Sequence, residues 1–214
     1  MNITDIIKDV RIVINEAVVE GDSFSAETDK AIENFVRAAL THLASMPSYQ
    51  GPTEDLKSTD SIKISNRPDG MYYATIQLPG NCIRPVSLEI GGWVRPVFSF
   101  PVAMGSTFLS QYASVQGLGA GPNSPVAFLD LNGKNIIAHA FTGSSVTEYT
   151  LSYIPVPQVD ADGTLDVPER YKDALIYTAS ALYLQSVNEY DAAKSAFDTA
   201  GSYIQLIDNK QSDK

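Results

Sequence analysis

Cysteine and histidine are scarce in this sequence of 214 residues. The single cysteine, Cys82, excludes a disulfide within the chain and any zinc site that needs several cysteines. Only His42 and His139 are available for a histidine-based metal site or for acid–base catalysis by histidine. We therefore predict a protein that is not an enzyme and that carries no cofactor.

Long apolar runs and positive charge are also lacking. No stretch approaches the roughly 18 apolar residues of a membrane span, and the first residues lack the basic start and apolar stretch of a signal peptide. We expect a protein that is made in a reducing cytoplasm and binds no membrane. The 25 acidic and 15 basic residues give a net charge of −10, which disfavours tight binding to a phosphate backbone. Sequence-specific binding of nucleic acid is therefore not expected.

The charges that are present are unevenly distributed. Residues 1–60 hold 11 acidic and 5 basic side chains, and residues 158–214 hold 10 and 5. The middle, residues 61–157, holds only 4 acidic and 5 basic side chains. Hydrophobic residues make up 44% of the chain, which is enough for a substantial core. This distribution indicates helices at both ends and strands in the middle.

The first predicted helix runs from Thr4 to Gly21. Its apolar residues recur at spacings of three and four, which is typical of an amphipathic helix with one buried face. Ile12 and Val19, seven residues apart, come out on the opposite side of the helical wheel. This second apolar pair indicates a surface that another molecule could cover.

Three more helices are predicted. One begins after Ser25, an N-cap residue, and ends before Pro47. Another has Pro168 at its first position and is apolar on all sides, as expected for a buried helix. The last is capped by Asn188, with Asp191 three residues later. Its apolar face comprises Ala193, Ala196, Phe197, Ala200, Ile204 and Ile207.

Between the helices, residues 46–60 form a predicted linker and the apolar period then changes to two. Pro68-Asp69-Gly70 predicts a turn that joins strands at 62–64 and 72–77 into a hairpin. Asn132-Gly133 predicts a second hairpin, in which Ala127 to Leu131 pairs with Asn135 to Ala140. The expected further strands cover 82–90, 93–100, 126–131, 135–141 and 146–154.

These elements predict an α+β fold. A two-helix hairpin covers its own apolar face poorly, so the helices from both ends should pack into one bundle. We therefore predict a discontinuous helical domain, residues 1–60 plus 158–214, with an inserted antiparallel β domain at residues 61–157. Short strands interrupted by glycine and proline favour a small sandwich or barrel for the insert.

Few residues suggest chemistry. His139 precedes Ser144 and Ser145, but no Gly-x-Ser-x-Gly elbow accompanies them, so a catalytic triad is a remote alternative. His42 lies at the margin of an apolar helix face, where an ordinary boundary histidine is expected. Cys82 has no identifiable base partner and is interpreted as a small apolar strand residue.

Two loops resemble ligand sites only in part. Gly117, Gly119 and Gly121 suggest a phosphate loop, yet Pro122 follows where a helix should begin. We interpret this segment as a flexible arm that contacts a partner. Asp160, Asp162, Thr164 and Asp166 alternate as in a calcium loop, but Tyr171 stands where the bidentate glutamate belongs. An acidic turn before a helix is the favoured interpretation, and calcium remains the alternative.

The order of elements then becomes informative. The segment Asp5 to Arg11, a second acidic helix, a low-charge β insert, the stretch Val167 to Leu175 and the helix start Asn188 to Ala193 follow one another. This pattern resembles the head-to-tail adaptors, or ring proteins, of short-tailed phages, including crAss-like phages. Only Pro168-x-x-Tyr171-x-Asp173-Ala174-Leu175 and the helix after it are motif-like.

The resemblance implies a structural virion protein of the phage neck, in a ring of many copies between the portal protein and the next tail component. It implies no catalytic residue and no metal. Packaged DNA would pass through such a ring. The sequence then suggests a ring interface that joins Ile12 and Val19 to the Tyr177 and Leu184 side of the third helix.

A tail that begins with Asp208, Asn209 and Lys210 is predicted to dock on the portal, because terminal segments often become ordered on binding. An alternative function is a carbohydrate-binding or receptor-binding β module of a phage structural protein. It would use Trp93 and neighbouring tyrosines, since sugars stack on aromatic rings.

Overall fold

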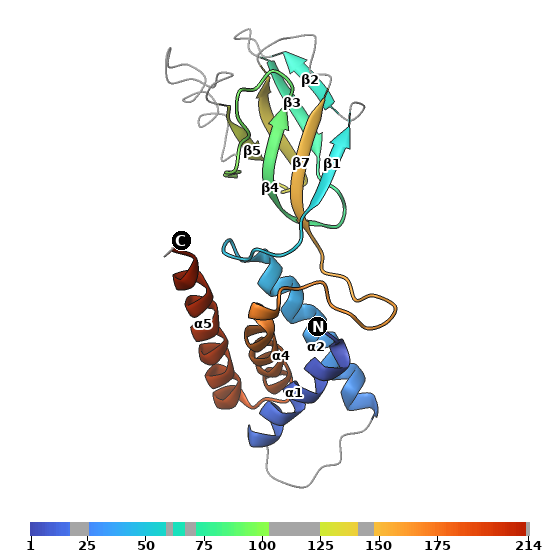
Figure 1. The fold of residues 1–214 in the computed structure, drawn as a ribbon, viewed down its shortest axis with the longest axis vertical. Coiled ribbons are helices and arrows are strands. Elements are labelled where there is room, and N and C mark those ends of the chain that lie inside the picture. Colours follow the sequence, from blue (N-terminus) through green and yellow to red (C-terminus); the bar gives the residue numbers. More distant parts are fainter. Residues whose placement is uncertain (18–25, 59–61, 67–71, 103–124, 141–147, 213–214) are drawn as a thin grey trace. The chain divides into compact units, whose positions relative to one another are not determined.

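The computed structural model describes residues 1–17, 26–58, 62–66, 72–102, 125–140 and 148–212. The chain divides into two compact units. Met1–Pro52 and Val156–Lys214 form the first, which we call the helical unit, and Thr53–Pro155 forms the second, the β unit. The fold is α+β, as predicted, with helices from both chain ends in one bundle and an antiparallel β insert between them in sequence (Figure 1).

One central helix organises the helical unit. Helix α4 (Lys172–Ser186) follows the short 3₁₀ helix η1 (Glu169–Tyr171) and packs against α1 (Ile3–Ala17), α2 (Ala26–Ser45) and α5 (Tyr190–Ser212). Its side chains are buried on several sides, which confirms the interpretation of an all-round apolar helix as a buried one. The hydroxyl groups of its buried Thr178 and Ser180 donate to the carbonyls of Ala174 and Ile176, so neither hydroxyl lacks a partner.

The N-terminal helices bury the faces that their periodicity predicts. Ile6, Val10 and Ile14 of α1 are at most 1% exposed. In α2, the buried side chains are Ile32, Val36, Ala39, Leu40, Leu43 and Ala44. Ion pairs join the elements at their rims: Lys172 contacts Asp9 at 3.0 Å between α4 and α1, and Arg11 contacts Asp29 between α1 and α2.

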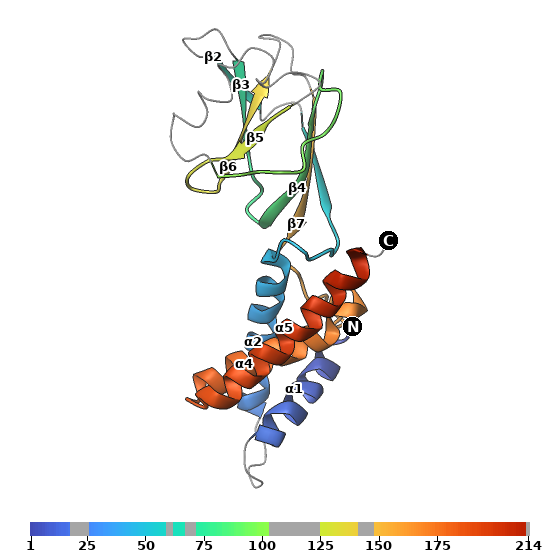
Figure 2. The same cartoon turned by 90° about the vertical axis from the view of Figure 1, so that its left-hand side faces the viewer.

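Helix α5 lies along α4 through small residues (Figures 1 and 2). Ala193, Ala196 and Ala200 are buried in this contact, as the predicted face requires. Phe197 differs most from this prediction, since 37% of its surface is exposed, and Ile204 and Ile207 are only partly buried. Assigning Phe197 to the core face was therefore wrong: alanine side chains bring the two helices close together, and a phenylalanine beside them is left at the edge of the contact.

The turn between α4 and α5 also differs from the prediction. Asn188 has a φ of +67° and lies after the C-terminus of α4. The N–H of Glu189 donates to the carbonyl of Leu184 at 2.9 Å, and the N–H of Asn188 donates to Gln185 at 3.2 Å. These two bonds form a Schellman motif, in which a residue that tolerates positive φ ends a helix. Asn188 thus ends α4, and it does not cap α5 as predicted.

The β unit is a sandwich of two antiparallel sheets. One sheet has the order β1 (Glu54–Ser58), β7 (Tyr149–Pro155), β4 (Cys82–Ile90). The other has the order β2 (Ile62–Asn66), β3 (Tyr72–Gln77), β6 (Asn135–Ala140), β5 (Ala127–Leu129). Side chains of both sheets form one core cluster, which includes Ile76, Leu88, Ile136 and Leu151. This shared core corresponds to the predicted sandwich.

Both predicted hairpins are present. Strand β2 pairs with β3, with Ile62 opposite Ile76, and β5 pairs with β6, with Ala127 opposite Ala138. Gly133 has a φ of +65°, which explains why glycine follows Asn132 in that tight turn. The Pro68-Asp69-Gly70 turn lies outside the described residues.

Two local predictions for the β unit were wrong. Strand β1 lies within the predicted linker and pairs with β7, with Leu56 opposite Leu151. Residues 93–100 form no regular strand; within them, Val97 exchanges two backbone hydrogen bonds with Leu88, of 2.8 and 2.9 Å. Pairing of this segment with β4 is therefore limited to a single bridge.

Candidate interaction surfaces

The acidic turn before η1 holds the start of α1. The N–H of Ile3 donates to the carbonyl of Gly163 at 2.8 Å, and the N–H of Leu165 donates to that of Met1 at 2.7 Å. The carboxylate of Asp162 accepts the N–H of Thr164 at 2.9 Å, and this bond lowers the pKa of Asp162. The turn therefore has a structural role, because it joins the two chain ends within the helical unit.

The candidate catalytic histidines belong to different units, and Ser144 and Ser145 lie outside the described residues. His42 is exposed in the last turn of α2, whereas His139 lies on β6 opposite Tyr73 of β3. Cys82 is half-buried, and burial raises the pKa of its thiol to about 11, which disfavours a reactive thiolate. Among the residues that the structure describes, no three His, Cys, Asp or Glu side chains are grouped so that they could hold a metal ion.

A contact that sequence analysis missed lies where the chain leaves the helical unit. The Tyr171 hydroxyl accepts the N–H of Gln50 at 3.0 Å and donates to the carbonyl of Ser48 at 3.2 Å. Arg170 donates to the carbonyl of Gln50 at 2.9 Å, and the rings of Tyr49 and Tyr171 lie 4.8 Å apart. The Pro168-x-x-Tyr171 pattern was the signal in the sequence, but Gln50, the partner of Tyr171, lies about 120 residues away in sequence.

Gly51 completes this contact. A Cβ atom at position 51 would overlap the ring of Tyr49, so only glycine leaves room for that ring. Burial, followed by the nearby Tyr171 and Asp166, raises the pKa of Tyr49 to about 12. The segment before the β unit is thus held firmly against η1.

The four predicted ring-interface residues differ in exposure and in whether the structure describes them. Ile12 is 58% exposed on α1, as expected for a contact residue, and Val19 lies outside the described residues. Tyr177 is partly buried and stacks on Tyr203 of α5, with ring centroids 5.7 Å apart. Leu184 is only 1% exposed. Assigning Leu184 to an interface was therefore wrong, because its own subunit already covers it.

The other predicted contact segments also change. Asp208, Asn209 and Lys210 belong to α5, which continues to Ser212, so they are part of this helix, and docking of the segment on the portal stays a prediction. Gly117, Gly119, Gly121 and Pro122 lie outside the described residues.

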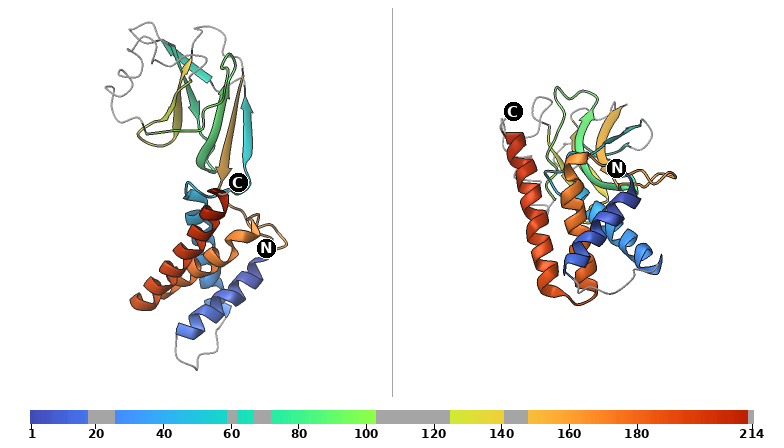
Figure 3. Two further views of the ribbon diagram at one scale, coloured as in Figure 1. Left: turned by 60° about the vertical axis from the view of Figure 1, so that its left-hand side comes forward. Right: turned by 60° about the horizontal axis from the view of Figure 1, so that its bottom comes forward.

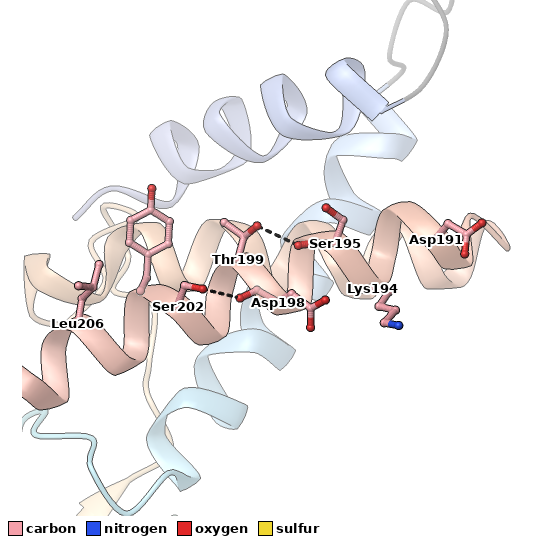
Figure 4. Close-up of a pocket in the computed structure, with 8 residues that line it drawn as sticks. Asp191, Lys194, Ser195, Asp198, Thr199, Ser202 and Leu206 are labelled. Carbon is pink, nitrogen blue, oxygen red and sulfur yellow. Dashed lines mark hydrogen bonds between the residues drawn. The ribbon is translucent and has the colours of Figure 1, made fainter.

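The outer face of α5 lines an open groove of about 620 Å³. Figure 4 shows its lining residues: Asp191, Lys194, Ser195, Asp198, Thr199, Ser202, Tyr203 and Leu206. The hydroxyls of Thr199 and Ser202 donate to carbonyls four residues earlier in the same helix, at 2.9 and 3.0 Å. The groove is therefore a largely polar helix face on which two of the hydroxyl donors are already used, and it does not resemble a reaction site.

A second groove, of about 460 Å³, lies on the β unit. Its lining is rich in proline and phenylalanine and comprises Arg95, Pro96, Val97, Phe98, Ser99, Pro101, Pro125, Val126, Ala127 and Phe128. Trp93 is only 9% exposed and belongs to the sandwich core, together with Tyr149 and Tyr153. The proposed use of Trp93 as a sugar-stacking platform was therefore wrong, since its ring is already covered.

The comparisons with known proteins identify the family. The family model described as SU10 adaptor protein matches residues 1–213. The chain belongs to the SU10 adaptor protein family. Membership over nearly the whole length identifies it as a structural adaptor of a phage virion, in agreement with the resemblance to head-to-tail adaptors.

Two further findings accompany this assignment. No curated protein matches the chain. None of the helices in the described ranges is both long and apolar enough to cross a membrane. The SU10 adaptor family is structural, and its partners are other components of the virion.

Proposed function

We propose that this SU10 adaptor protein forms a dodecameric ring in the phage neck, between the portal protein and the next tail component. Family membership over residues 1–213 is the observation that carries this proposal.

The exposed apolar residues of the helical unit support self-assembly. Ile12 of α1 and Tyr190 of α5 are 58% and 62% exposed, and they lie on helices that pack against α4 separately. A cyclic ring needs two different surfaces on each subunit, because every contact joins one surface to the other. The helical unit offers such a pair.

The distribution of charge supports a DNA passage. The sequence segments of the helical unit contain 18 acidic and 9 basic residues, whereas those of the β unit contain 7 and 6. An acidic wall repels phosphate, so DNA would slide past it without adhering. We propose that the helical unit lines the channel, and that each unit is a separate domain.

Mass measurement tests the proposal. Light scattering coupled to size exclusion should give a multiple of the subunit mass, either for the protein alone or when the portal protein of the same virus is added. Negative-stain images of the assembled fraction should show rings. A monomer under both conditions would contradict the proposed function.

A further inference from the structure

Strand β1 forms one edge of the three-stranded sheet in the β unit. It pairs with β7 on one side, and no other described strand pairs with it. The left view of Figure 3 shows β1, in cyan, at the border of this sheet beside β7. An edge strand presents backbone N–H and C=O groups to which a further strand can bind. A strand of another molecule could therefore extend the sheet at β1.

The outer face of β1 carries two charges that have no charged neighbour on β7. Side chains alternate along a strand, so Leu56 points to the sandwich core, against which it packs, whereas Asp55 and Lys57 point away from it. Opposite these two exposed residues lie Ser152 and Thr150. The Ser152 hydroxyl donates to the Asp55 carboxylate at 2.5 Å. Neither charge forms an ion pair with a described residue.

The order of charges along β1 is complementary to itself. Two copies of the strand can run antiparallel with Leu56 opposite Leu56 of the other copy. Asp55 of each copy then lies opposite Lys57 of the other. Opposite charges that face each other across antiparallel strands stabilise a sheet, and like charges destabilise it. This register therefore forms two favourable charge pairs and also covers more of Leu56, which is half-buried in the single subunit.

Other registers lose this match. A shift by one residue would place Leu56 opposite Asp55 or Lys57, although these side chains belong to different faces of the sheet. Antiparallel pairing centred on Asp55 or on Lys57 would place equal charges opposite each other, and so would parallel pairing in register. The register centred on Leu56 is the one among these that matches both charge and face.

The remaining charge of β1 is satisfied within the subunit. The carboxylate of Glu54 accepts the hydroxyl of Tyr153 and, at 3.2 Å, the side-chain amide of Asn81. In the register centred on Leu56, the residue opposite Glu54 is Ser58 of the other copy, which is uncharged. Glu54 therefore causes no repulsion between the two strands.

We propose that two copies of this protein pair through β1, antiparallel and centred on Leu56, so that their β1–β7–β4 sheets become continuous. A second copy is the occupant of the edge because the charge order of β1 fits itself. This two-fold contact closes after two copies, so it does not build a ring and goes beyond the proposed function. It pairs free subunits, and where subunits already form a ring it joins two rings. Five residues make a small interface, so the association is weak and depends on concentration.

Charge reversal tests the contact. Asp55→Lys and Lys57→Asp each place like charges opposite each other in a pair of identical copies, and both should remain folded because the positions are exposed. In sedimentation at increasing concentration, the wild type should change from one subunit to two. Each variant should require at least about tenfold higher concentration. If the wild type forms rings by itself, it should form double rings, and the variants should form single rings.

Glu89→Lys is the matched control. Glu89 is exposed on β4, at the other end of the same sheet, and it lies opposite Thr150 of β7, as Lys57 does. The substitution changes the net charge by the same amount as Asp55→Lys. It should self-associate as the wild type does. Circular dichroism confirms the fold of each variant.

Mixing the two defective variants tests the register. In a pair of one Asp55→Lys copy and one Lys57→Asp copy, positions 55 and 57 carry only positive charges on one strand and only negative charges on the other. Equal amounts should therefore form a dimer at concentrations where neither variant does so alone. A chain that carries both substitutions has the reversed charge order and should pair with itself again.

The outcomes separate this contact from the proposed function. A wild type that shows neither dimers nor double rings at any concentration overturns the pairing. Unchanged association of Asp55→Lys, or a mixture that stays monomeric, overturns the register at β1. Loss of portal binding by Asp55→Lys with unchanged self-association also overturns it, because the edge would then face the portal. Rings that still form in the variants leave the proposed function intact, since ring contacts involve other surfaces.

Discussion

The hydroxyl of Tyr171 accepts a hydrogen bond from the backbone N–H of Gln50 at 3.0 Å, across 121 residues of sequence. The same hydroxyl donates to the carbonyl of Ser48, and the Tyr171 ring is buried against that of Tyr49. One side chain thus satisfies two backbone groups of the segment that leads out of the helical unit. The end of η1 and the segment that contains Ser48 and Gln50 therefore depend on each other.

Removing that hydroxyl should destabilise the helical unit. Tyr171→Phe leaves the N–H of Gln50 and the carbonyl of Ser48 without this partner, and we expect a loss of about 1 to 3 kcal/mol of unfolding free energy. Urea unfolding followed by circular dichroism at the helical signal measures the loss. Tyr190→Phe is the control, because its hydroxyl bonds Asn188 on the surface and its removal should change little. Equal stabilities of the two variants would contradict the assigned role of Tyr171.

Alkaline pH should weaken the same region. Burial raises the pKa of Tyr49 from its usual 10 to about 12, so the folded protein holds this proton more tightly than the unfolded chain does. The corresponding stabilisation is complete below pH 10 and is lost as the pH rises to about 12. Two pKa units correspond to about 2 to 3 kcal/mol.

The measurement is the unfolding free energy of the helical unit as a function of pH. In Tyr49→Phe, the decline between pH 10 and 12 should be shallower than in the wild type, because one titrating group has been removed. Comparison with the wild type at each pH subtracts the titration of the other tyrosines. Identical slopes would show that Tyr49 titrates normally.

The turn between α4 and α5 should prefer glycine or asparagine. Asn188 has a φ of +67°, a conformation that most L residues adopt only at a cost of about 1 to 2 kcal/mol. Asn188→Ala should lower the unfolding free energy by about 1 kcal/mol, whereas Asn188→Gly should be nearly neutral. Thermal unfolding of both variants measures this difference. If alanine and glycine behaved alike, the Schellman turn would not depend on this conformation.

A charge at Val10 and a charge at Phe197 should affect the stability of the helical unit differently. Val10 is fully buried on α1, so Val10→Asp should place an unpaired charge in the core and unfold the helical unit. Phe197→Asp should leave a cooperative, native-like unfolding transition, because 37% of Phe197 is already exposed. Circular dichroism at increasing temperature distinguishes the two. Loss of structure in the Phe197 variant would mean that this ring contributes more to the core than its burial indicates.

Patterns that repeat within one segment were sufficient for much of the fold. The spacing of apolar residues predicted α1 and α2, and Asn132-Gly133 predicted the β5–β6 hairpin. Each of these features depends on residues that are close in sequence. The hairpin depends on its turn residues, and each helix depends on apolar residues that recur along one side. The uneven distribution of charge also distinguished the helical ends from the strand-rich middle, because it can be read within each segment.

Features that depend on distant partners were not visible in those patterns. The sequence of β1 resembles a charged linker. It forms a strand because β7, about a hundred residues later, supplies its hydrogen-bond partners. Leu184 and Trp93 are large apolar residues of the kind that interfaces also contain. They are buried only because α4 and the two sheets are covered by elements far away in sequence. Likewise, only the packing of α5 on α4 through alanines leaves Phe197 at the surface.

The sequence by itself determined the type and order of most elements, with β1 as an exception, because apolar periodicity and turn residues act over a few positions. Only the tertiary structure decided which of the apolar faces remain available to a partner. Burial depends on what covers a side chain, and in this protein the covering element usually comes from the other end of the chain.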